Sequence, residues 1–380
     1  MKKLFLFLMG AFLVLGLCSC NDNTQNEPIN NNVSSYIGLD ISVTNTKLDS
    51  GNIEDTVENI YDSVVAIESY YNGTHTGSGS GVVFGKTDSM SFIVTCHHVI
   101  EGCNGFDVIF SNGEVASAIL IGGDDKSDVA VLAVDKVDLC YVSWFDNTDE
   151  LRLGSTVICI GNPLGTLPGS VSTGVVSYNN RVIKVDDYNN MTLIQTDVAI
   201  NSGNSGGGLF NSAGALIGIV NAKYSSSGIE GLGFAIPANQ AKTIVTQILE
   251  TALYNEEENS WITGYVEGRW NLGFTLGYGG YGFYRTVIGV AESASNETSS
   301  DYGLLFSNDT INSIVIKYSD SSKESKELLN ISAQTMTIEY VYSFIYSAEL
   351  SLGDSLIFNI TRGNDTLDVE VELIQYRYYL

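Results

Sequence analysis

The sequence is poor in basic residues and in proline. Lys and Arg number 18 against 44 Asp and Glu, which gives a formal net charge of −26 at pH 7. Nucleic acids and anionic lipid surfaces are polyanions, so this charge argues against either as the main binding partner. With only 4 prolines, the chain is neither proline-rich nor collagen-like.

Cysteine and histidine are also scarce. The 6 cysteines are scattered and form no C-x-x-C pair, and the 3 histidines show no metal-ligand spacing. We therefore expect no disulfide scaffold, no metal site and no cofactor. Export would permit disulfides, but buried free thiols are equally compatible with the positions of Cys96, Cys103, Cys140 and Cys159.

Glycine, tyrosine and apolar residues, by contrast, are abundant. The 39 glycines and 21 tyrosines favour strands joined by glycine turns, and the 44% hydrophobic content is ample for packed cores. A typical domain has about 100 to 200 residues, so a chain of 380 residues predicts two folded units with targeting and linker segments.

The N-terminus has the pattern of an export signal. Lys2 and Lys3 precede the apolar run Leu4–Leu17, which is shorter than a membrane span of about 20 residues but typical of a signal-peptide core. The segment Leu17-Cys18-Ser19-Cys20 resembles the lipobox of bacterial lipoproteins, in which a small residue precedes the lipidated cysteine. We therefore expect an exported protein anchored at the outer face of the cell membrane through Cys20; an ordinary signal peptide is the alternative.

Composition and periodicity divide the chain into five segments. They are a lipoprotein signal peptide (1–20), an Asn-rich disordered tether (21–52), a first domain (53–253), an acidic linker (254–263) and a second domain (264–380). Short β-branched runs between turn residues predict an antiparallel sandwich or barrel in the first domain. Helical spacing predicts a short helix near residue 53 and another at 239–253. The second domain is mostly strand-like and ends in two strands around the turn at Gly363.

Three motifs place reactive side chains in the order His, Asp, Ser. They are Val94–Ile100 with His98, Lys126–Leu132 with Asp128, and Asn201–Gly207 with Ser205. Together they resemble the catalytic segments of the HtrA/DegP family of trypsin-like serine proteases. The resemblance covers most of residues 55–250 and extends to Gly77–Gly81, Ile160–Gly165, Gln195–Asp197 and Gly233–Pro237. It implies a mainly β fold, with a trypsin-like double β-barrel protease domain at 53–253.

These residue types suit nucleophilic catalysis. A serine hydroxyl is a poor nucleophile until a base accepts its proton, and a neutral histidine can both accept and return that proton near physiological pH. We expect His98 to be this base, Asp128 to orient its ring and Ser205 to attack the substrate. His97 is the rival base, but His98 is followed by Val-Ile as in the family, so His97 is predicted to be a structural or exposed neighbour.

The resemblance also implies an oxyanion hole. It lies in the backbone of Gly203, Asn204 and Ser205, with the N–H groups of Gly203 and Ser205 as donors to the carbonyl oxygen that gains negative charge.

Two further features predict how a substrate is bound. In trypsin-like folds the residue six before the nucleophile, here Ala199, lies at the floor of the primary specificity pocket. An uncharged floor disfavours Lys and Arg side chains and favours small or medium apolar ones. The residues expected to form the edge that pairs with an extended peptide are Val220, Asn221, Ala222 and Lys223.

The second domain resembles a divergent PDZ domain. Leu272-Gly273-Phe274 resembles the loop that receives a peptide carboxylate, and Gly303–Ile311 resembles the usual glycine-to-aspartate turn. Such a domain binds the C-terminal end of an extended peptide at a sheet edge. The glycine- and tyrosine-rich stretch Gly277–Tyr284 departs from the pattern, and a structural β-domain without a ligand is the alternative.

The predicted function is that of an exported, membrane-anchored serine endopeptidase that cleaves unfolded or damaged proteins in protein quality control. The resemblance implies a homotrimer. Two alternatives use the same fold: a holdase that binds non-native chains without cleaving them, and a processing protease with one surface partner.

Overall fold

The computed structural model describes residues 39–44, 52–162, 167, 169–184, 190–224, 231–255, 260–279, 287–294, 299–331 and 336–376. The predicted signal peptide, Cys20 and most of the predicted tether lie outside these ranges. Within them, no helix combines the length and the apolar character needed to cross a bilayer.

Six antiparallel strands form a first closed barrel. They are β2 (Val64–Tyr71), β3 (Thr74–Lys86), β4 (Ser91–Thr95), β5 (Gly105–Ile109), β6 (Val115–Asp124) and β7 (Val129–Val134). The strand order is β3-β2-β5-β6-β7-β4, and the pairing of β4 with β3 closes the ring. Every residue of β7 is buried, as expected for a run of Val, Ala and Leu packed on both faces.

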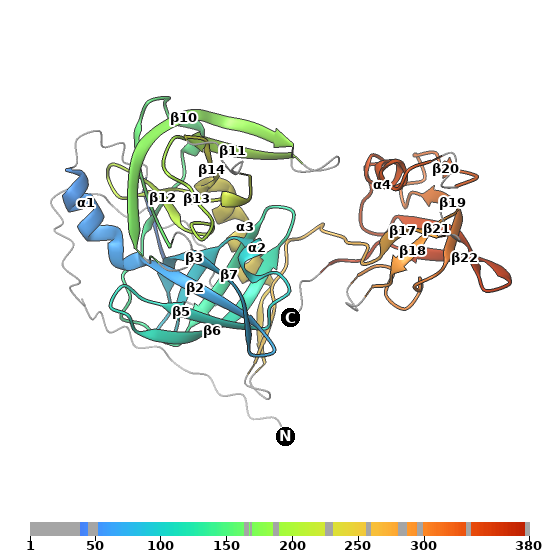
Figure 1. Cartoon of the computed structure of the whole chain (residues 1–380), viewed down its shortest axis with the longest axis horizontal. Coiled ribbons are helices and arrows are strands. Elements are labelled where there is room, and N and C mark those ends of the chain that lie inside the picture. Colours follow the sequence, from blue (N-terminus) through green and yellow to red (C-terminus); the bar gives the residue numbers. More distant parts are fainter. Residues whose placement is uncertain are drawn as a thin grey trace, which may run out of the picture.

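A second barrel repeats this arrangement. Its strands are β9 (Thr156–Gly161), β10 (Ser170–Lys184), β11 (Asn190–Thr196), β12 (Gly208–Asn211), β13 (Leu216–Val220) and β14 (Gly233–Pro237). The order is β12-β9-β10-β11-β14-β13, and β12 also pairs with β13. The two barrels lie side by side in the larger lobe of the molecule (Figure 1), which confirms the predicted trypsin-like double barrel.

Two short strands join the barrels. Strand β1 (Asp40–Thr44) pairs with β3 of the first barrel and with β8 (Ser143–Phe145), which pairs in turn with β13. Strand β1 lies inside the range predicted to be a disordered tether. The alternation of Ile41 and Val43 with polar residues suits a strand, and pairing on both sides satisfies its backbone groups.

The two helices that sequence periodicity predicted lie outside the barrels. Helix α1 (Ile53–Ile60) begins at Asn52, whose side chain accepts a hydrogen bond from the Glu54 amide, and a 3₁₀ turn (Tyr61–Ser63) leads into β2. Another 3₁₀ turn covers Thr148–Glu150. Helix α3 (Ala238–Thr251) follows β14 and buries one face against the barrels; the buried residues are Ala238, Ala241, Val245, Ile248 and Leu249.

The segment predicted as an acidic linker contains a small hairpin. Strands β15 (Leu253–Asn255) and β16 (Ser260–Ile262) pair, and Trp261 packs against the large hydrophobic cluster that both barrels share. After the hairpin, the Gly264 amide donates to the Ile121 carbonyl at 2.7 Å. The apolar residues that flank the acidic stretch thus tie this segment to the barrel unit.

The C-terminal unit has a sheet, a helix and a core of its own. Its strands are β17 (Thr275–Gly279), β18 (Val287–Glu292), β19 (Thr310–Lys317), β20 (Lys326–Leu328), β21 (Ser355–Arg362) and β22 (Asp365–Glu372), with helix α4 (Ile338–Tyr346). The sheet order is β17-β18-β19-β21-β22, and β20 pairs with β19. This unit forms the smaller lobe in Figure 1, and the β21–β22 hairpin confirms the predicted final pair of strands.

Candidate active site

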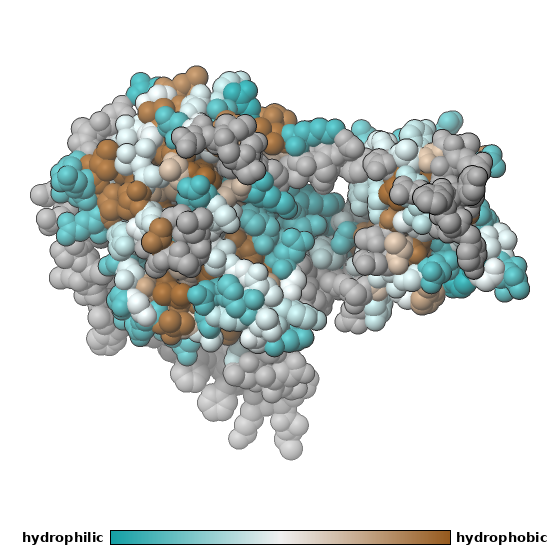
Figure 2. Space-filling view, in the orientation of Figure 1, coloured by the Kyte–Doolittle hydropathy of each residue, from teal (hydrophilic) through white to brown (hydrophobic). Residues whose placement is uncertain are grey.

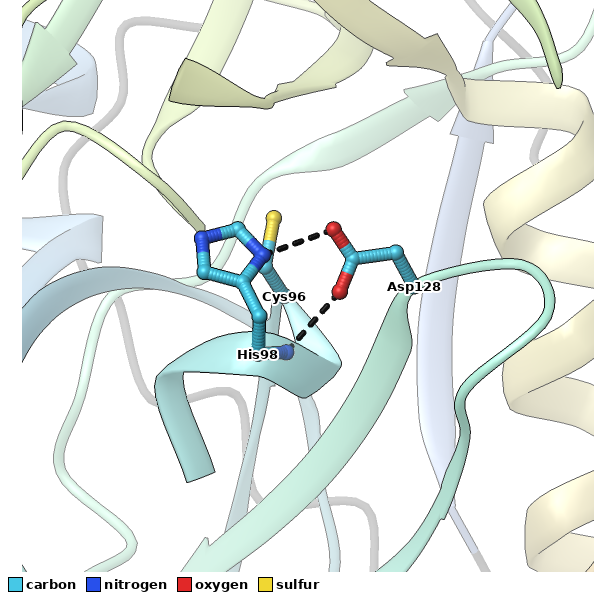
Figure 3. A group of neighbouring side chains, drawn as sticks. All are labelled: Cys96, His98 and Asp128. Atoms are coloured by element: carbon cyan, nitrogen blue, oxygen red, sulfur yellow. Dashed lines mark hydrogen bonds and ion pairs between the residues drawn. The ribbon is translucent and has the colours of Figure 1, made fainter. Parts of the chain in front are cut away.

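His98 lies in α2 (His97–Ile100), a single helical turn directly after β4. Its backbone N–H donates to Asp128 Oδ1 at 2.8 Å, and its ring Nδ1 is 2.7 Å from Asp128 Oδ2 (Figure 3). Because a carboxylate only accepts, the Nδ1 atom carries the proton and Nε2 is left as a hydrogen-bond acceptor. The structure thus brings together the predicted base and the predicted orienting acid.

Asp128 ends the turn between β6 and β7 and has a φ of 55°. It is 2% exposed and accepts a third hydrogen bond, from Asn221 Nδ2 to Oδ2 at 2.8 Å. Burial raises the pKa of this carboxyl, but the hydrogen bonds and the charge of His98 outweigh burial and leave the pKa below its ordinary value. Asp128 is therefore ionised when His98 needs a partner.

Ser205 lies in the loop between β11 and β12, which crosses to the first barrel. Its carbonyl accepts from the Ser80 amide of β3 at 2.8 Å. The next residue, Gly206, has a φ of 85°, and a Cβ there would lie 2.1 Å from the Ser80 carbonyl oxygen. Only glycine fits this position, which gives a physical reason for the Ser-Gly-Gly sequence.

Adjacent residues after β13 contact two members of the predicted triad. Asn221 bonds Asp128, and the Ala222 N–H donates to Ser205 Oγ at 3.2 Å. Among the described residues, no hydrogen bond joins His98 to Ser205. The His–Asp pair is thus formed, while the serine hydroxyl accepts from the backbone N–H of Ala222 after β13.

The backbone of the serine loop leaves two amides available. Gly203 has a φ of 94°, a left-handed conformation that suits glycine. The Asn204 N–H donates to the Asn201 carbonyl at 3.0 Å, whereas neither the Gly203 nor the Ser205 N–H donates to another group in the described part of the chain. These are the two amides predicted to line an oxyanion hole; Asn204 contributes through its side chain, which donates to the Ala199 carbonyl at 3.2 Å.

Ser80 is a site residue that sequence reasoning missed. Its side chain is fully buried and donates to the Gly203 carbonyl at 2.8 Å, while accepting from the Asn162 N–H at 2.8 Å. Its own carbonyl accepts from Thr95 Oγ1 at 2.7 Å. Ser80 lies within the Gly77–Gly81 motif. The motif contributed to the family resemblance, but the sequence assigned no role to the Ser80 hydroxyl.

The residues predicted to bind substrate differ in their exposure and in their backbone hydrogen bonds. Ala199 and Lys223 are both exposed. Val220 is buried and uses its N–H and C=O within the protein, bonded to Gly207 and Gly206. Asn221 is buried against Asp128, and the 3₁₀ turn Ala222–Tyr224 replaces the extended edge that sequence reasoning expected.

His97 and the cysteines are not members of the predicted triad. His97 is 3% exposed, and burial lowers the pKa of its ring, so it is the structural neighbour of the two predicted possibilities. Cys96, Cys103, Cys140 and Cys159 are free thiols, which answers the question that the sequence left open.

The turn that carries Asp128 is tied to the C-terminal unit. Asp124 is 4% exposed; it accepts from Ser127 N–H and Oγ, and it receives both Nε and Nη2 of Arg269 at 3.0 Å. In the same turn, Lys126 Nζ lies 4.9 Å from the Trp270 ring centroid. The two units are therefore joined four residues from the orienting acid.

The predicted carboxylate loop of the C-terminal unit binds an internal carboxylate. The Gly273 N–H donates to Asp301 Oδ1 at 2.7 Å, and Leu272 and Phe274 are buried in the core. Asp301 is fully buried, and burial raises the pKa of its carboxyl. In the neighbouring strand β17, the Leu276 N–H donates to the hydroxyl of Tyr342 on α4 at 2.9 Å.

Comparisons with known proteins agree with this geometry. The family model described as the trypsin-like peptidase domain matches residues 79–219. The serine protease Do-like HtrB of Bacillus subtilis is 38% identical over 262 residues, which cover 64% of this chain and 57% of that protein. The Do-like HtrA of Lactococcus lactis subsp. cremoris is 30% identical over 280 residues, which cover 65% of this chain and 69% of that protein.

Further relatives and a solved structure extend the match. A probable periplasmic serine protease do/HhoA-like protein of Haemophilus influenzae is 42% identical over 46% of this chain. The solved HtrA-type protease AlgW with tripeptide superposes with a TM-score of 0.50 and 25% identity, covering 86% of this chain and 97% of AlgW. The chain spans about half the length of several curated relatives, 57% of HtrB and 49% of the Bacillus subtilis HtrA. The double barrel, with its His–Asp pair and serine loop, agrees with these matches: the chain belongs to the Do-like HtrA family of trypsin-like serine proteases.

Proposed function

We propose that the protein is a serine endopeptidase that hydrolyses extended segments of unfolded or damaged proteins. The observation that carries this proposal is the 2.7 Å contact of His98 Nδ1 with Asp128 Oδ2, beside a serine loop that keeps the Gly203 and Ser205 amides unused. A base, its orienting acid and two oxyanion donors are what acyl transfer requires.

The residues act in a defined order. Asp128 fixes the His98 tautomer, so Nε2 accepts the Ser205 proton as the hydroxyl attacks the peptide carbonyl. The amides of Gly203 and Ser205 stabilise the oxyanion of the tetrahedral intermediate. His98 then passes the proton to the leaving amine, and water releases the acyl group by the same route. Asn221 holds the Asp128 carboxylate in place throughout, through its 2.8 Å hydrogen bond.

The bond between the Ala222 N–H and Ser205 Oγ defines the resting state in this proposal. An extended peptide that pairs with the backbone after Val220 would straighten the 3₁₀ turn Ala222–Tyr224 and withdraw that amide. Ser205 would then be free to bond His98 Nε2. Binding of a substrate main chain thus completes the triad, which suits an enzyme for unfolded segments.

Export, membrane attachment and assembly complete the proposal. Relatives named periplasmic support an extracytoplasmic location, and the lipobox-like segment ending at Cys20 supports a lipid anchor in quality control at the membrane. A homotrimer through the barrel unit is supported by the family resemblance and by the apolar patches on the surface of that unit (Figure 2). Analytical ultracentrifugation of the full chain in detergent tests the trimer.

The activity is tested with a fluorophosphonate probe. We expect the parent chain to be labelled at Ser205, as located by peptide mapping, and to degrade unfolded casein. His98→Ala and Ser205→Ala should lose labelling and cleavage by about 10⁴-fold or more, because each removes a member of a unit that acts as a whole.

Other outcomes assign other functions. Absence of labelling in the presence of unfolded protein would contradict the proposal. Protection of an aggregating client that survives Ser205→Ala would favour the holdase, and a single cut in one surface protein without casein cleavage would favour the processing enzyme.

We also propose that the C-terminal unit binds the C-terminal ends of peptides between β17 and α4. Its support is the sequence resemblance to PDZ domains and the position of Leu272, Gly273 and Phe274 directly before edge strand β17. A peptide carboxylate would replace Asp301 on the Gly273 amide, and its main chain would replace Tyr342 on Leu276.

A further inference from the structure

A thiol lies beside the catalytic pair and has no part in the proposed reaction. Cys96 directly precedes α2, and its Sγ, the His98 ring and the Asp128 carboxylate each offer one ligand atom within 4.8 Å of the others (Figure 3). Proton transfer between Ser205 and His98 requires the carboxylate but no sulfur. The cluster therefore combines catalytic groups with a side chain of different chemistry.

The three side chains form a donor set for a soft divalent cation. Zn²⁺ and Cd²⁺ bind thiolate sulfur, imidazole nitrogen and carboxylate oxygen, and a tetrahedral ion leaves one further position for water or a carbonyl. The Val220 carbonyl oxygen, which accepts from the Gly206 N–H, also accepts from Cys96 Sγ at 3.3 Å and so fixes the position of the sulfur beside the cluster. A thiolate and a carboxylate together neutralise the double charge of the ion, which matters because Cys96 and Asp128 are buried.

We propose that Cys96, His98 and Asp128 form an inhibitory site for a soft divalent cation such as Zn²⁺ or Cd²⁺. The sequence argued against a metal site because its histidines show no ligand spacing. The fold supplies the missing proximity: β4 and its helical turn bring Cys96 and His98 to Asp128 at the start of β7.

Binding changes the protonation of the base. The ion bonds to Cys96 Sγ, His98 Nδ1 and an Asp128 oxygen; the thiol proton leaves to solvent, and the Nδ1 proton moves to Nε2. The imidazole stays neutral but carries its hydrogen on the nitrogen that should accept the Ser205 proton. It is no longer a base for Ser205, so acylation stops.

Access to the site is limited by the His98 ring. Cys96 is fully buried, whereas the His98 side chain is 21% exposed. The ion must enter while the ring is turned toward solvent, so we expect inhibition to develop slowly and to reverse when a chelator is added.

The primary experiment measures metal binding rather than activity. The full chain is titrated with Cd²⁺ while the ultraviolet absorption of the cadmium–thiolate bond is recorded, a signal that surface carboxylates do not give. We expect one ion per chain in the parent and loss of the signal in Cys96→Ala. Cys159→Ala is the matched control, since Cys159 is another buried free thiol, on β9 of the second barrel, and should bind as the parent does.

Two more variants keep the test decisive. His98→Ala should weaken Cd²⁺ binding by about 100-fold or more, since even the outer-shell partners of metal ligands contribute about 10- to 100-fold. Cys96→Ser preserves the volume and the folded state if the alanine variant does not fold, and it should lose the thiolate signal. A parent without the signal, or a signal that survives in Cys96→Ser or in His98→Ala at parental affinity, overturns the proposal.

A second readout separates the metal site from the proposed protease activity. The inference that the site is inhibitory rests on that proposed activity. Zn²⁺ should slow fluorophosphonate labelling of the parent, and about 100-fold more Zn²⁺ should be needed for Cys96→Ser. A cadmium–thiolate signal in a parent chain that the fluorophosphonate probe does not label would support the metal site and contradict the proposed protease activity. Labelling that Zn²⁺ does not slow, in a parent chain without the cadmium–thiolate signal, would support the protease activity and contradict the metal site.

Discussion

At the scale of single residues, the site depends on buried polar groups whose partners lie in the other barrel. Asn221 and Ser80 are both fully buried; the first bonds Asp128 and the second bonds the Gly203 carbonyl. A buried donor is retained only where it is satisfied, so each fixes the conformation of the backbone around it. Neither role follows from the spacing of the motifs, because spacing does not say which way a side chain points.

Ser80→Ala should impair catalysis without disturbing the His98–Asp128 pair. Loss of the hydroxyl removes the bonds to the Gly203 carbonyl and the Asn162 N–H, so the serine loop keeps only the backbone bond between the Ser80 amide and the Ser205 carbonyl as its link to Ser80. We expect kcat to fall by about 10- to 100-fold, less than the effect of deleting an oxyanion donor outright, with KM and the acid limb of the pH profile unchanged. Peptide hydrolysis as a function of pH measures all three.

Ser63→Ala is the matched control for Ser80→Ala. Ser63 is 1% exposed and its hydroxyl donates to one carbonyl, that of Ile60, next to β2. Both variants should lose about 1 kcal/mol of unfolding free energy, but only Ser80→Ala should lose turnover. Equal kcat values in the two variants would show that Ser80 is merely structural.

At the scale of elements, the sequence predicted well those segments whose local preference agrees with their tertiary setting. Helix α3 and the β21–β22 hairpin show clear periodicity and turn residues, and the structure confirms them. Helix α4 was missed because its Ile, Tyr, Val and Phe residues favour strands. Its helical form depends on the Thr337 cap and on burial of Val341 and Ile345, which are four residues apart.

The groove between β17 and α4 should open when Tyr342 loses its hydroxyl. In the parent, that hydroxyl accepts the Leu276 N–H, which a peptide carbonyl would need for strand addition. Tyr342→Phe should therefore tighten binding of a fluorescent peptide with a free C-terminus by about tenfold, the equivalent of one hydrogen bond that no longer competes. Fluorescence anisotropy of the full chain measures the change.

The controls for the groove distinguish a specific effect from loosened packing. Tyr318→Phe removes another tyrosine hydroxyl, which donates to the Ala348 carbonyl in the same unit, and should leave affinity unchanged. The same peptide with an amidated C-terminus should bind Tyr342→Phe weakly, because the Gly273 amide selects a carboxylate. Equal binding of both peptides would contradict a PDZ-like site.

Acid should weaken the C-terminal unit through Asp309, which ends the predicted glycine-to-aspartate turn. Its carboxylate accepts Arg362 Nε and Nη2, both at 2.7 Å, and the Phe306 N–H. Burial raises the Asp309 pKa, but the bonds to Arg362 and Phe306 prevail and leave it below its ordinary value. A lowered folded-state pKa contributes stability above about pH 4, the unfolded value, and that contribution is lost as pH falls toward the folded value.

The pH dependence is measured by urea unfolding of the parent and Asp309→Asn. The parent should be more stable at neutral pH, and the difference should shrink steadily below about pH 4. Asp365→Asn, which changes an exposed carboxylate at the start of β22, is the control, because it leaves the hydrogen bonds of Asp309 in place. A difference that stays constant on acidification would mean that ionisation of Asp309 contributes nothing.

At the scale of the whole molecule, an ion pair links the two units close to Asp128. Asp124 is the last residue of β6, directly before the turn that carries Asp128, and its bidentate partner Arg269 lies at the start of the C-terminal unit. Sequence analysis predicted two folded units, but a pairing between residues 145 positions apart leaves no trace in local patterns. This contact ties the C-terminal unit to the end of β6, directly before the turn that carries Asp128.

Breaking the pair should uncouple the two units. Because Asp124 is nearly buried, Arg269→Met leaves an unpaired buried charge, and we expect about 3 kcal/mol of destabilisation of the barrel unit. The double variant Asp124→Asn with Arg269→Met should recover part of this loss. Calorimetry should change from one transition toward two, and fluorophosphonate labelling of Ser205 should slow because the turn before Asp128 is less constrained.

The exposed pair Lys317–Glu370 provides the control for this double-mutant cycle. Both side chains are 53% exposed and lie within the C-terminal unit, so their coupling energy should be below about 1 kcal/mol, with no effect on labelling. A similarly small coupling for Asp124 and Arg269, with labelling unchanged, would mean that the units share a contact but no signal. A large coupling accompanied by slower labelling requires that the position of the C-terminal unit and the readiness of the triad are linked, since the two substitutions touch neither His98 nor Ser205.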